Sequence, residues 1–268
     1  MKYGFIGTGC MGGALATACA KAIGPEDILL SNRSPEKAQA LAEKLGAIPA
    51  DNETITRDCD VIFLGVKPQT MAQMLLPLQP ILTGRRTPFV LVSMAAGVTI
   101  EALQDMAGGR YPVVRIMPNT ACAVGAGMTT YTCSAEVTDR QRQTVLDALA
   151  ASGLLEEIEE GLMGAASAVA GCGGAYACLF LEGLADCGVL CGLPRKKAQR
   201  MAAQMLLGMA TQALESDEHT GALKDAVCSP AGSTIAGIRK LESMSFRSAA
   251  MEAVIAAWER EREMQQQK

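Results

Sequence analysis

A glycine-rich loop between a strand pattern and a helix pattern constrains this fold more than any other feature of the sequence. The run Gly7-Thr8-Gly9-Cys10-Met11-Gly12 fits G-x-G-x-x-G. It follows the apolar run 3–6 and opens the Ala-rich segment 10–23. A strand, this loop and a helix in that order are typical of a dinucleotide-binding turn. A glycine-rich turn without a ligand is the alternative interpretation.

Each position of this loop has a predicted task. We expect Gly7 to permit a tight turn, Gly9 to let the backbone approach a pyrophosphate, and Gly12 to allow close packing of the helix. Unpaired amides at the start of the helix would face the phosphate charge. We therefore predict that Gly7, Gly9, Cys10, Met11 and Gly12 bind a dinucleotide cofactor.

The end of the second expected strand, 28–30, indicates which dinucleotide binds. NAD enzymes usually have Asp or Glu there for the ribose hydroxyls, whereas this chain has Ser31-Asn32-Arg33. Glu26 and Asp27 precede the strand and therefore lie at its wrong end. An arginine with small polar neighbours suits a ribose 2′-phosphate. We predict that Ser31, Asn32 and Arg33 bind NADP, with NADPH preferred over NADH; a merely solvated arginine is the alternative.

Strand and helix patterns alternate through the first half of the chain. Further strands are expected at 61–64, 89–92 and 113–116, and further helices at 35–45, 70–78 and 99–106. We expect 128–132 and 154–158 to add edge strands that flank a helix at 139–150. This alternation predicts an α/β fold with a Rossmann-like, doubly wound parallel sheet.

The second half has a different pattern. From residue 161 onward no strand pattern is visible, and apolar residues such as Ala198, Met201, Ala202 and Met205 recur at helical spacing. We predict a dinucleotide-binding domain at 1–160 and an all-α dimerisation domain at 161–268. The helical half is richer in apolar residues than extended helices could bury alone, which predicts an obligate homodimer through the C-terminal helices.

Composition argues against several classes of protein. The chain is 49% hydrophobic, which does not suit a disordered protein. A net charge of −4, without long runs of Lys or Arg, gives no support for nucleic-acid binding. The longest apolar runs have the length of strands, so we expect no membrane span. There is no signal-peptide pattern, and we expect a soluble cytoplasmic protein.

Ten cysteines could suggest disulfides or a metal site. Most of them lie in helix or strand patterns, where a free cysteine acts as a small buried apolar residue, as a reducing cytosol allows. Cys187 and Cys191 are one helical turn apart and could form part of a zinc site. Zinc usually needs four N or S ligands, and His219 is the only histidine, so we predict no metal site.

Further motifs carry a family resemblance. They are Gly65-Val66-Lys67-Pro68, the runs 92–100, 115–120, 184–189, 192–195 and 223–225, and Ser229-Pro230-Ala231-Gly232-Ser233-Thr234-Ile235. In order and spacing, over nearly the whole chain, they resemble the pyrroline-5-carboxylate reductase family. The chain departs from the family pattern at Ala121 and Gly174, where the family usually has Pro, and at Ala231, where it usually has Gly.

The resemblance implies roles for individual residues. It implies that the dinucleotide is also lined by Asn52, Val66, Lys67, Pro68, Ala95, Ala96 and Asn119. It implies a site for a carboxylate substrate at Glu218, Ser229, Gly232, Ser233 and Thr234, with Thr234 nearest the chemistry. Without the resemblance, Thr234 could be a first-turn polar residue, Lys67 a solvated charge, and Ser229 part of a turn.

The function implied is NADPH-dependent reduction of 1-pyrroline-5-carboxylate to L-proline. The resemblance also implies that dimers are built into a larger ring, and it leaves a decamer of dimers open. One alternative is an NADP-dependent reductase of another small cyclic imine or ketoacid. A catalytically silent NADP-binding scaffold is a second alternative, because a fold alone does not establish activity. A metal-binding redox protein is the third.

Overall fold

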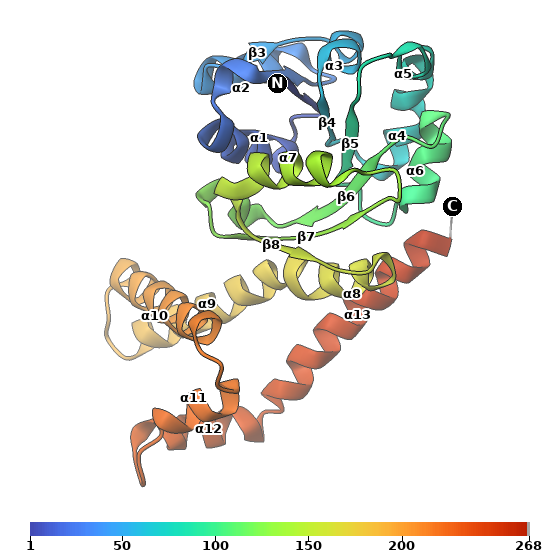
Figure 1. The fold of residues 1–268 in the computed structure, drawn as a ribbon. Helices are drawn as coiled ribbons and strands as arrows, with labels where there is room; N and C mark the ends of the chain where they lie inside the picture. Colours follow the sequence, from blue (N-terminus) through green and yellow to red (C-terminus); the bar gives the residue numbers. More distant parts are fainter. Residues whose placement is uncertain (267–268) are drawn as a thin grey trace. The chain divides into compact units, whose positions relative to one another are not determined.

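The computed structural model describes residues 1–266, and side chains as far as residue 263 (Figure 1). The chain separates into two compact units. One contains residues 1–172 together with the end of the chain from Ala257, and the other contains residues 173–256. The predicted domain boundary at residue 160 stays a prediction, because the two compact units are defined only by contacts within a single chain.

The first unit is built on an eight-stranded sheet with the order β3-β2-β1-β4-β5-β6-β7-β8. Its strands are β1 Tyr3–Ile6, β2 Ile28–Ser31, β3 Ile48–Pro49, β4 Val61–Leu64, β5 Val90–Ser93, β6 Val113–Pro118, β7 Gly127–Cys133 and β8 Gly153–Glu157. All neighbouring pairs are parallel except β6 and β7. The predicted Rossmann-like doubly wound fold is confirmed.

The expectation of two added edge strands was wrong for the first of them. β7 lies inside the sheet, hydrogen-bonded to β6 on one side and to β8 on the other, so of these two strands β8 alone is an edge strand. The short helical turn Thr120–Val124 reverses the chain after β6. A connection of this length joins antiparallel neighbours, whereas parallel neighbours need a long crossover.

Helices cover both faces of the sheet (Figure 1). One face carries α1 Cys10–Ile23, α2 Pro35–Leu45 and α7 Asp139–Leu149. The other carries α3 Asn52–Asp58, α4 Pro68–Leu75, α5 Gln79–Gly84 and α6 Ile100–Ala107. Both faces of the central strands are therefore buried, which explains their continuous apolar sequences.

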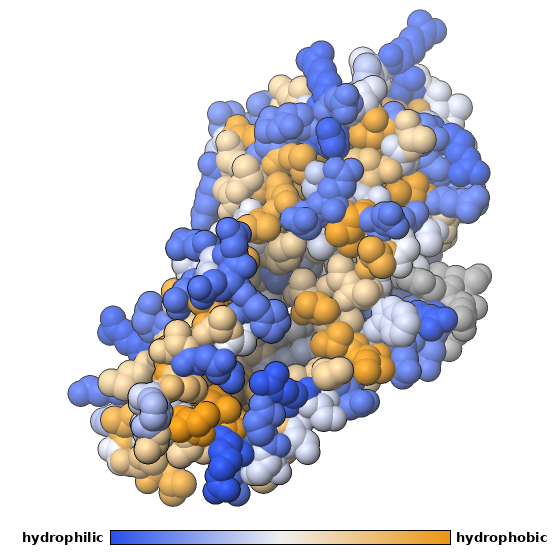
Figure 2. Space-filling model, turned by 60° about the horizontal axis from the view of Figure 1, so that its bottom comes forward, coloured by the Kyte–Doolittle hydropathy of each residue, from blue (hydrophilic) through white to orange (hydrophobic). Residues whose placement is uncertain are grey.

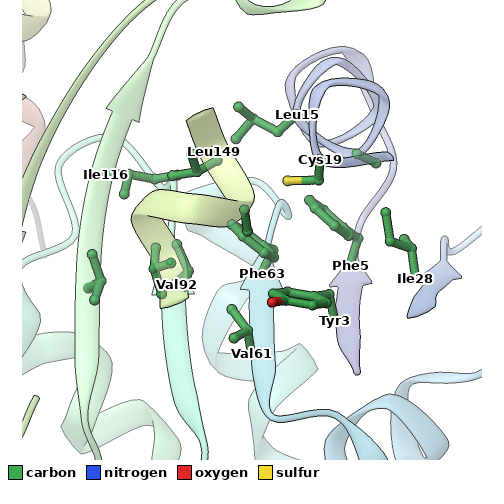
Figure 3. Packing of buried hydrophobic residues seen from close by; sticks show 14 of the residues in the cluster. Tyr3, Phe5, Leu15, Cys19, Ile28, Val61, Phe63, Val92, Ile116 and Leu149 are labelled. Atoms are coloured by element: carbon green, nitrogen blue, oxygen red, sulfur yellow. The ribbon is translucent and has the colours of Figure 1, made fainter. Parts of the chain in front are cut away.

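An aromatic pair lies at the centre of the α1 and α7 side of the sheet (Figure 3). The rings of Phe5 and Phe63 stack with their centroids 4.3 Å apart, and Leu15 and Cys19 of α1 belong to the same cluster. Burial raises the pKa of the Cys19 thiol. This cluster fixes α1, and with it the loop that precedes α1, against the sheet.

The rest of the described chain is helical. Its elements are α8 Met163–Ala166, a π-helical turn Ser167–Gly171, α9 Gly173–Leu190, α10 Arg195–Glu215, α11 Thr220–Ala226, α12 Ser233–Ser243 and α13 Phe246–Gln266. No strand follows β8 within residues 1–266, in agreement with the predicted all-α second half.

The 173–256 unit buries few side chains when it is considered by itself. Its buried hydrophobic residues are Ala185, Ala198, Ala202 and Leu223. Many large apolar side chains are exposed instead, including Leu190, Leu214 and Met251, which are 87%, 76% and 64% exposed. Figure 2 shows hydrophobic residues open on the surface beside hydrophilic ones. A single chain therefore leaves an apolar helical surface uncovered.

Fewer cysteines are buried than the sequence predicted. Only Cys19, Cys59 and Cys122 are buried, whereas Cys10, Cys178, Cys187 and Cys191 are exposed. Cys178 and Cys187 lie on α9 and Cys191 directly follows it; the sequence of α9 looks like a core helix, but its surface is largely open in one chain. No disulfide joins the described cysteines.

One helical run differs from the expectation that no segment could span a membrane. Residues 160–190 form a helical run of 31 residues that contains an 18-residue window with a mean hydropathy of 1.5, long and apolar enough for a span by those two criteria. Only 11% of that window is buried. The run also carries Glu160, Glu182 and Asp186, charges that are costly in a bilayer core.

Candidate functional site

The glycine loop is held by three close backbone approaches. Gly7 has φ +98°, a conformation that favours glycine, and its amide donates to the Ser31 carbonyl at 2.9 Å. A Cβ at Gly12 would lie 2.1 Å from the Gly7 carbonyl oxygen, and one at Gly65 would lie 2.3 Å from the same atom. Side chains at these positions would force α1 away from β1 and β4.

Gly9 differs from the other glycines of the loop. A Cβ built there meets no atom within 4 Å, so the space in front of its backbone is open. Gly9 is the N-cap of α1, with no side-chain cap and no acidic residue in the first turn of the helix. The first amides of α1 therefore keep their partial positive charge available for an anion.

Thr8 adds a donor that sequence reasoning missed. This residue is 8% exposed, and its Oγ1 has no hydrogen-bond partner among the described residues. A buried hydroxyl without a partner is costly. Together with the open approach at Gly9, it fits a loop that binds phosphate oxygens, so the residues present suit a dinucleotide.

Polar residues gather where β2 ends. The Ser31 hydroxyl donates to Asn52 Oδ1 at 2.5 Å, which joins the end of β2 to the start of α3. Asp51 caps α3 by accepting from the Thr54 amide at 2.6 Å. That hydrogen bond lowers the pKa of the Asp51 carboxyl. Arg33 is exposed and makes no ion pair or hydrogen bond within the described part of the chain.

Two adjoining cavities share these polar residues. The first, of about 530 Å³, is lined by Ile6, Gly7, Gly9, Asn32, Arg33, Asn52, Gly65, Val66, Lys67, Thr70, Gln73 and Met74. The second, of about 920 Å³, includes Ser31, Asn32 and Asn52 in its lining. The structure thus brings together candidates from three separate motifs at the point where the strand order reverses about β1, the usual ligand crevice of such sheets.

The cavities also contain residues that were not predicted. Gly65 was visible within a motif, but its packing against Gly7 was not. Thr70, Gln73 and Met74 line the first cavity from α4 and carry no motif of their own. Their only sequence signal is helical spacing after Pro68, which is the first residue of α4. Lys67 is exposed at the N-cap of that helix.

The remaining cofactor candidates lie outside the lining of the first cavity. Cys10 and Met11 are in the first turn of α1. Ala95 and Ala96 follow β5, and Asn119 follows β6, at the same edge of the sheet as the glycine loop. The side chain of Asn119 is engaged: Nδ2 donates to the Ala170 carbonyl at 3.1 Å, and Oδ1 accepts from the Met128 amide at 3.3 Å.

The substrate candidates belong to the 173–256 unit. Glu218 is exposed just before α11, and the other candidates surround the start of α12. The Gly232 amide donates to the Ser229 carbonyl at 3.0 Å, and a Cβ at Gly232 would lie 2.4 Å from Ser229 Oγ.

Helix α12 begins at Ser233, one residue earlier than Thr234. Gly232 is its N-cap and makes no side-chain hydrogen bond, so the first amides of α12 lack a side-chain cap. Both Ser233 and Thr234 are exposed. Ala231 has φ 58°, the left-handed conformation, in which a glycine would be unstrained. The start of α12 can thus offer amides and hydroxyls to a small carboxylate.

His219 serves as a helix cap. Its Nδ1 accepts a hydrogen bond from the Gly221 amide at 3.0 Å at the start of α11. Within the described residues no group of three or more His, Cys, Asp or Glu side chains is arranged to hold a metal ion.

Known proteins resemble the chain over its full length. A family model described as pyrroline-5-carboxylate reductase dimerisation matches residues 160–264. One described as NADP oxidoreductase, coenzyme F420-dependent, matches residues 2–97. The pyrroline-5-carboxylate reductase of Escherichia coli is 38% identical over 262 residues, covering 97% of this chain and 96% of that protein. Its counterpart from Methanosarcina acetivorans is 39% identical over 266 residues, with coverages of 98% and 97%.

Solved structures give the same result. The crystal structure of Plasmodium falciparum pyrroline carboxylate reductase with NADP bound has a TM-score of 0.88 and 34% identity, covering 99% of this chain and 98% of that one. A pyrroline-5-carboxylate reductase from Coxiella burnetii has a TM-score of 0.88 and 31% identity, with 98% coverage of both chains.

Proposed function

The chain belongs to the pyrroline-5-carboxylate reductase family, and on that premise we propose that it reduces 1-pyrroline-5-carboxylate to L-proline with NADPH. The observation that carries this function is the full-length similarity to curated reductases. An NADP-bound relative supports the same cofactor, as does the phosphate-binding geometry around Thr8 and Gly9.

The bound cofactor supplies the hydride, so the residues of the protein bind, orient and exclude water. At the adenosine end, Arg33 is free to pair with the ribose 2′-phosphate, and Ser31 and Asn52 hold the neighbouring backbone in place. The loop at Gly9 and the first turn of α1 receive the pyrophosphate. These contacts fix the reacting end of the cofactor relative to the sheet.

The substrate is anchored by its carboxylate. The first amides of α12, at Ser233 and Thr234, and the hydroxyl of Ser229 hold that group, and Glu218 contributes at the edge of the site. Anchoring determines which face of the imine receives the hydride. The imine carbon gains a hydride and the ring nitrogen carries a proton in the product. A protonated imine accepts hydride readily, so no strong acid is required, in keeping with the capping role of His219.

The Thr234 hydroxyl orients the ring nitrogen. It can donate or accept, so it can contact the nitrogen in either protonation state. Thr234→Val keeps the shape and removes the hydroxyl, and turnover should fall by about ten- to a thousandfold. NADPH affinity should stay unchanged, and Thr234→Ser should retain most activity. Normal turnover in Thr234→Val, or a loss only of melting temperature, would exclude this role.

The reaction itself is tested by mixing the purified protein with NADPH and pyrroline-5-carboxylate. We expect NADPH absorbance to fall and proline to appear in equal amount. Faster turnover of a six-membered cyclic imine or of a ketoacid would redirect the proposal to the alternative reductase. The departures at Ala121, Gly174 and Ala231 are the positions to examine in that case. NADPH binding without oxidation of any substrate would favour a silent scaffold.

The family match to a dimerisation domain establishes a homo-oligomer. We propose further that the chains form a homodimer through their C-terminal helices and that the dimers are arranged in a larger ring, as a decamer of dimers. We also propose that the protein is soluble in the cytoplasm. The exposed apolar side chains of the 173–256 unit support the dimer. The apolar run at residues 160–190 then lies at a subunit interface and not in a bilayer. Sedimentation of the purified protein measures the assembly, and a fully active monomer would contradict it.

A further inference from the structure

An ion pair between a buried arginine and a partly exposed glutamate lies next to the loop that follows β5. Arg115 on β6 is 2% exposed, and one of its Nη atoms donates to Glu160 Oε1 at 3.0 Å. Its Nε and other Nη have no partner among the described residues. Glu160 is therefore the only acidic group paired with this guanidinium in the described chain. A buried charge with a single partner depends strongly on that partner.

The same carboxylate oxygen has a second donor. Glu160 Oε1 accepts from the Ile100 amide at 2.7 Å. Ile100 is the first residue of α6, and the neighbouring Thr99 caps that helix by accepting from the Ala102 amide at 3.2 Å. Glu160 therefore fixes the point where the 94–99 loop enters α6.

Arg115 lies at the other end of this loop. In the register of the parallel pair, Arg115 stands opposite Ser93, the last residue of β5. The Ser93 hydroxyl accepts from the Ala95 amide at 3.4 Å. The ion pair thus joins the two ends of the 94–99 loop: Arg115 beside its start and Glu160 at its end. We call this closed connection the 115–160 staple.

The loop between these ends is also buried. Ala95 and Val98 are 2% and 1% exposed, and Gly97 takes φ 70°. Ala95 and Ala96 belong to the proposed cofactor site. A shift of the staple would move these backbone groups as a unit, because the segment is short and tightly packed.

We propose that Arg115 and Glu160 are positioning residues for NADPH: the 115–160 staple holds the 94–99 loop in the conformation that binds the cofactor. Neither residue touches the cofactor in this proposal, and both act through the loop. This inference rests on the proposed function. It extends the proposed function by assigning a role to Arg115 and Glu160. Glu160 is also the first residue of the segment matched to the dimerisation family.

The test separates positioning from stability by comparing single and double variants. Glu160→Gln removes the counter-charge of the buried guanidinium and weakens both hydrogen bonds to position 160, so both melting temperature and NADPH affinity should fall, the affinity by about three- to thirtyfold. Arg115→Met combined with Glu160→Gln removes both charges, so the melting temperature should recover. The affinity should stay low, because the loop is no longer tied to β6. Backbone amides 95–100 should exchange hydrogen faster than in the unchanged protein.

Glu101, the residue after Ile100, offers a matched control. Glu101 is in the same first turn of α6 and forms an exposed pair with Arg110 at 3.6 Å. Glu101→Gln removes a charge from the same helix without touching the staple, and it should leave NADPH affinity unchanged.

The outcomes are distinguishable. If affinity recovers together with melting temperature in the double variant, or never changes, the staple serves stability alone and the inference fails. A double variant that does not fold leads to the same conclusion. If the unchanged protein binds no NADPH, the proposed function fails first, and the inference fails with it.

Discussion

The three glycines Gly9, Gly12 and Gly13 should respond very differently to the same substitution, alanine. Gly9 has open space where a Cβ would stand, at φ −71°, which any residue adopts. Gly12 would place a Cβ 2.1 Å from the Gly7 carbonyl oxygen. At Gly13 the nearest atoms would be 3.6 Å away, an ordinary contact within a helix.

Gly9→Ala should alter binding but not folding. Alanine makes the unfolded chain less flexible, which stabilises the folded protein by about 0.4–1 kcal/mol. Loss of glycine at the N-cap destabilises the helix by a similar amount, so the free energy of unfolding should change by less than about 0.5 kcal/mol. The added methyl occupies the approach to the first amides of α1. Losing one charge-assisted hydrogen bond of about 1.5–3 kcal/mol weakens NADPH by about ten- to a hundredfold.

Gly12→Ala and Gly13→Ala serve as comparisons for stability and NADPH binding. Gly12→Ala should destabilise the fold by about 1–3 kcal/mol or more, because α1 must move away from the loop. Gly13→Ala should stabilise α1 by about 0.5–1 kcal/mol and leave NADPH binding unchanged. Thermal unfolding and NADPH titration on all three proteins measure both quantities. Unchanged NADPH affinity in Gly9→Ala would refute the assignment of the pyrophosphate to this loop.

Three further results are expected. Arg33→Ala should weaken NADPH by about ten- to a hundredfold and leave NADH nearly unchanged; equal losses in titrations with both cofactors would show that Arg33 does not bind the 2′-phosphate. Ala231→Gly should raise stability by up to about 1 kcal/mol, since relief of the left-handed strain exceeds the added chain entropy; a lower melting temperature would contradict this. Asp51→Ala should cost about 0.5–2 kcal/mol at neutral pH through loss of the α3 cap. Because the hydrogen bond from Thr54 lowers the pKa of Asp51 in the folded protein, this contribution is complete above the unfolded pKa of about 3.9 and is lost as pH falls through the folded value. The melting temperatures of the two proteins should therefore converge in acid, and a constant difference would count against the cap.

Sequence patterns were most informative where glycine and proline mark an element. The expected helices 10–23 and 35–45 have those bounds in the structure, because Gly9, Gly24, Pro35 and Gly46 start or stop them. α3 was not predicted: its seven residues are mostly polar and too short for a periodic signal. The antiparallel return of β7 was also not predicted, since strand direction depends on the length of the connection and not on the strand sequence.

Some residues of the candidate site were predictable from the sequence, and others were not. The glycine loop and the polar end of β2 were predictable, because their residue types have few other uses. Thr8 and Gly65 were missed because their importance comes from burial and from contact with Gly7, which lie outside any local pattern. The exposed cysteines of α9 were misjudged because a helix with an apolar sequence need not be covered by other parts of its own chain.

The scarcity of buried side chains in the 173–256 unit has a consequence for the amount of enzyme in a cell. If the proposed homodimer is obligate, its folding stability depends on the concentration of chains as well as on their sequence. A fall in expression would therefore reduce enzyme level more than proportionally, because solitary chains expose Leu190, Leu214 and Met251 to proteases and to aggregation. Newly made chains face the same exposure until they meet a partner.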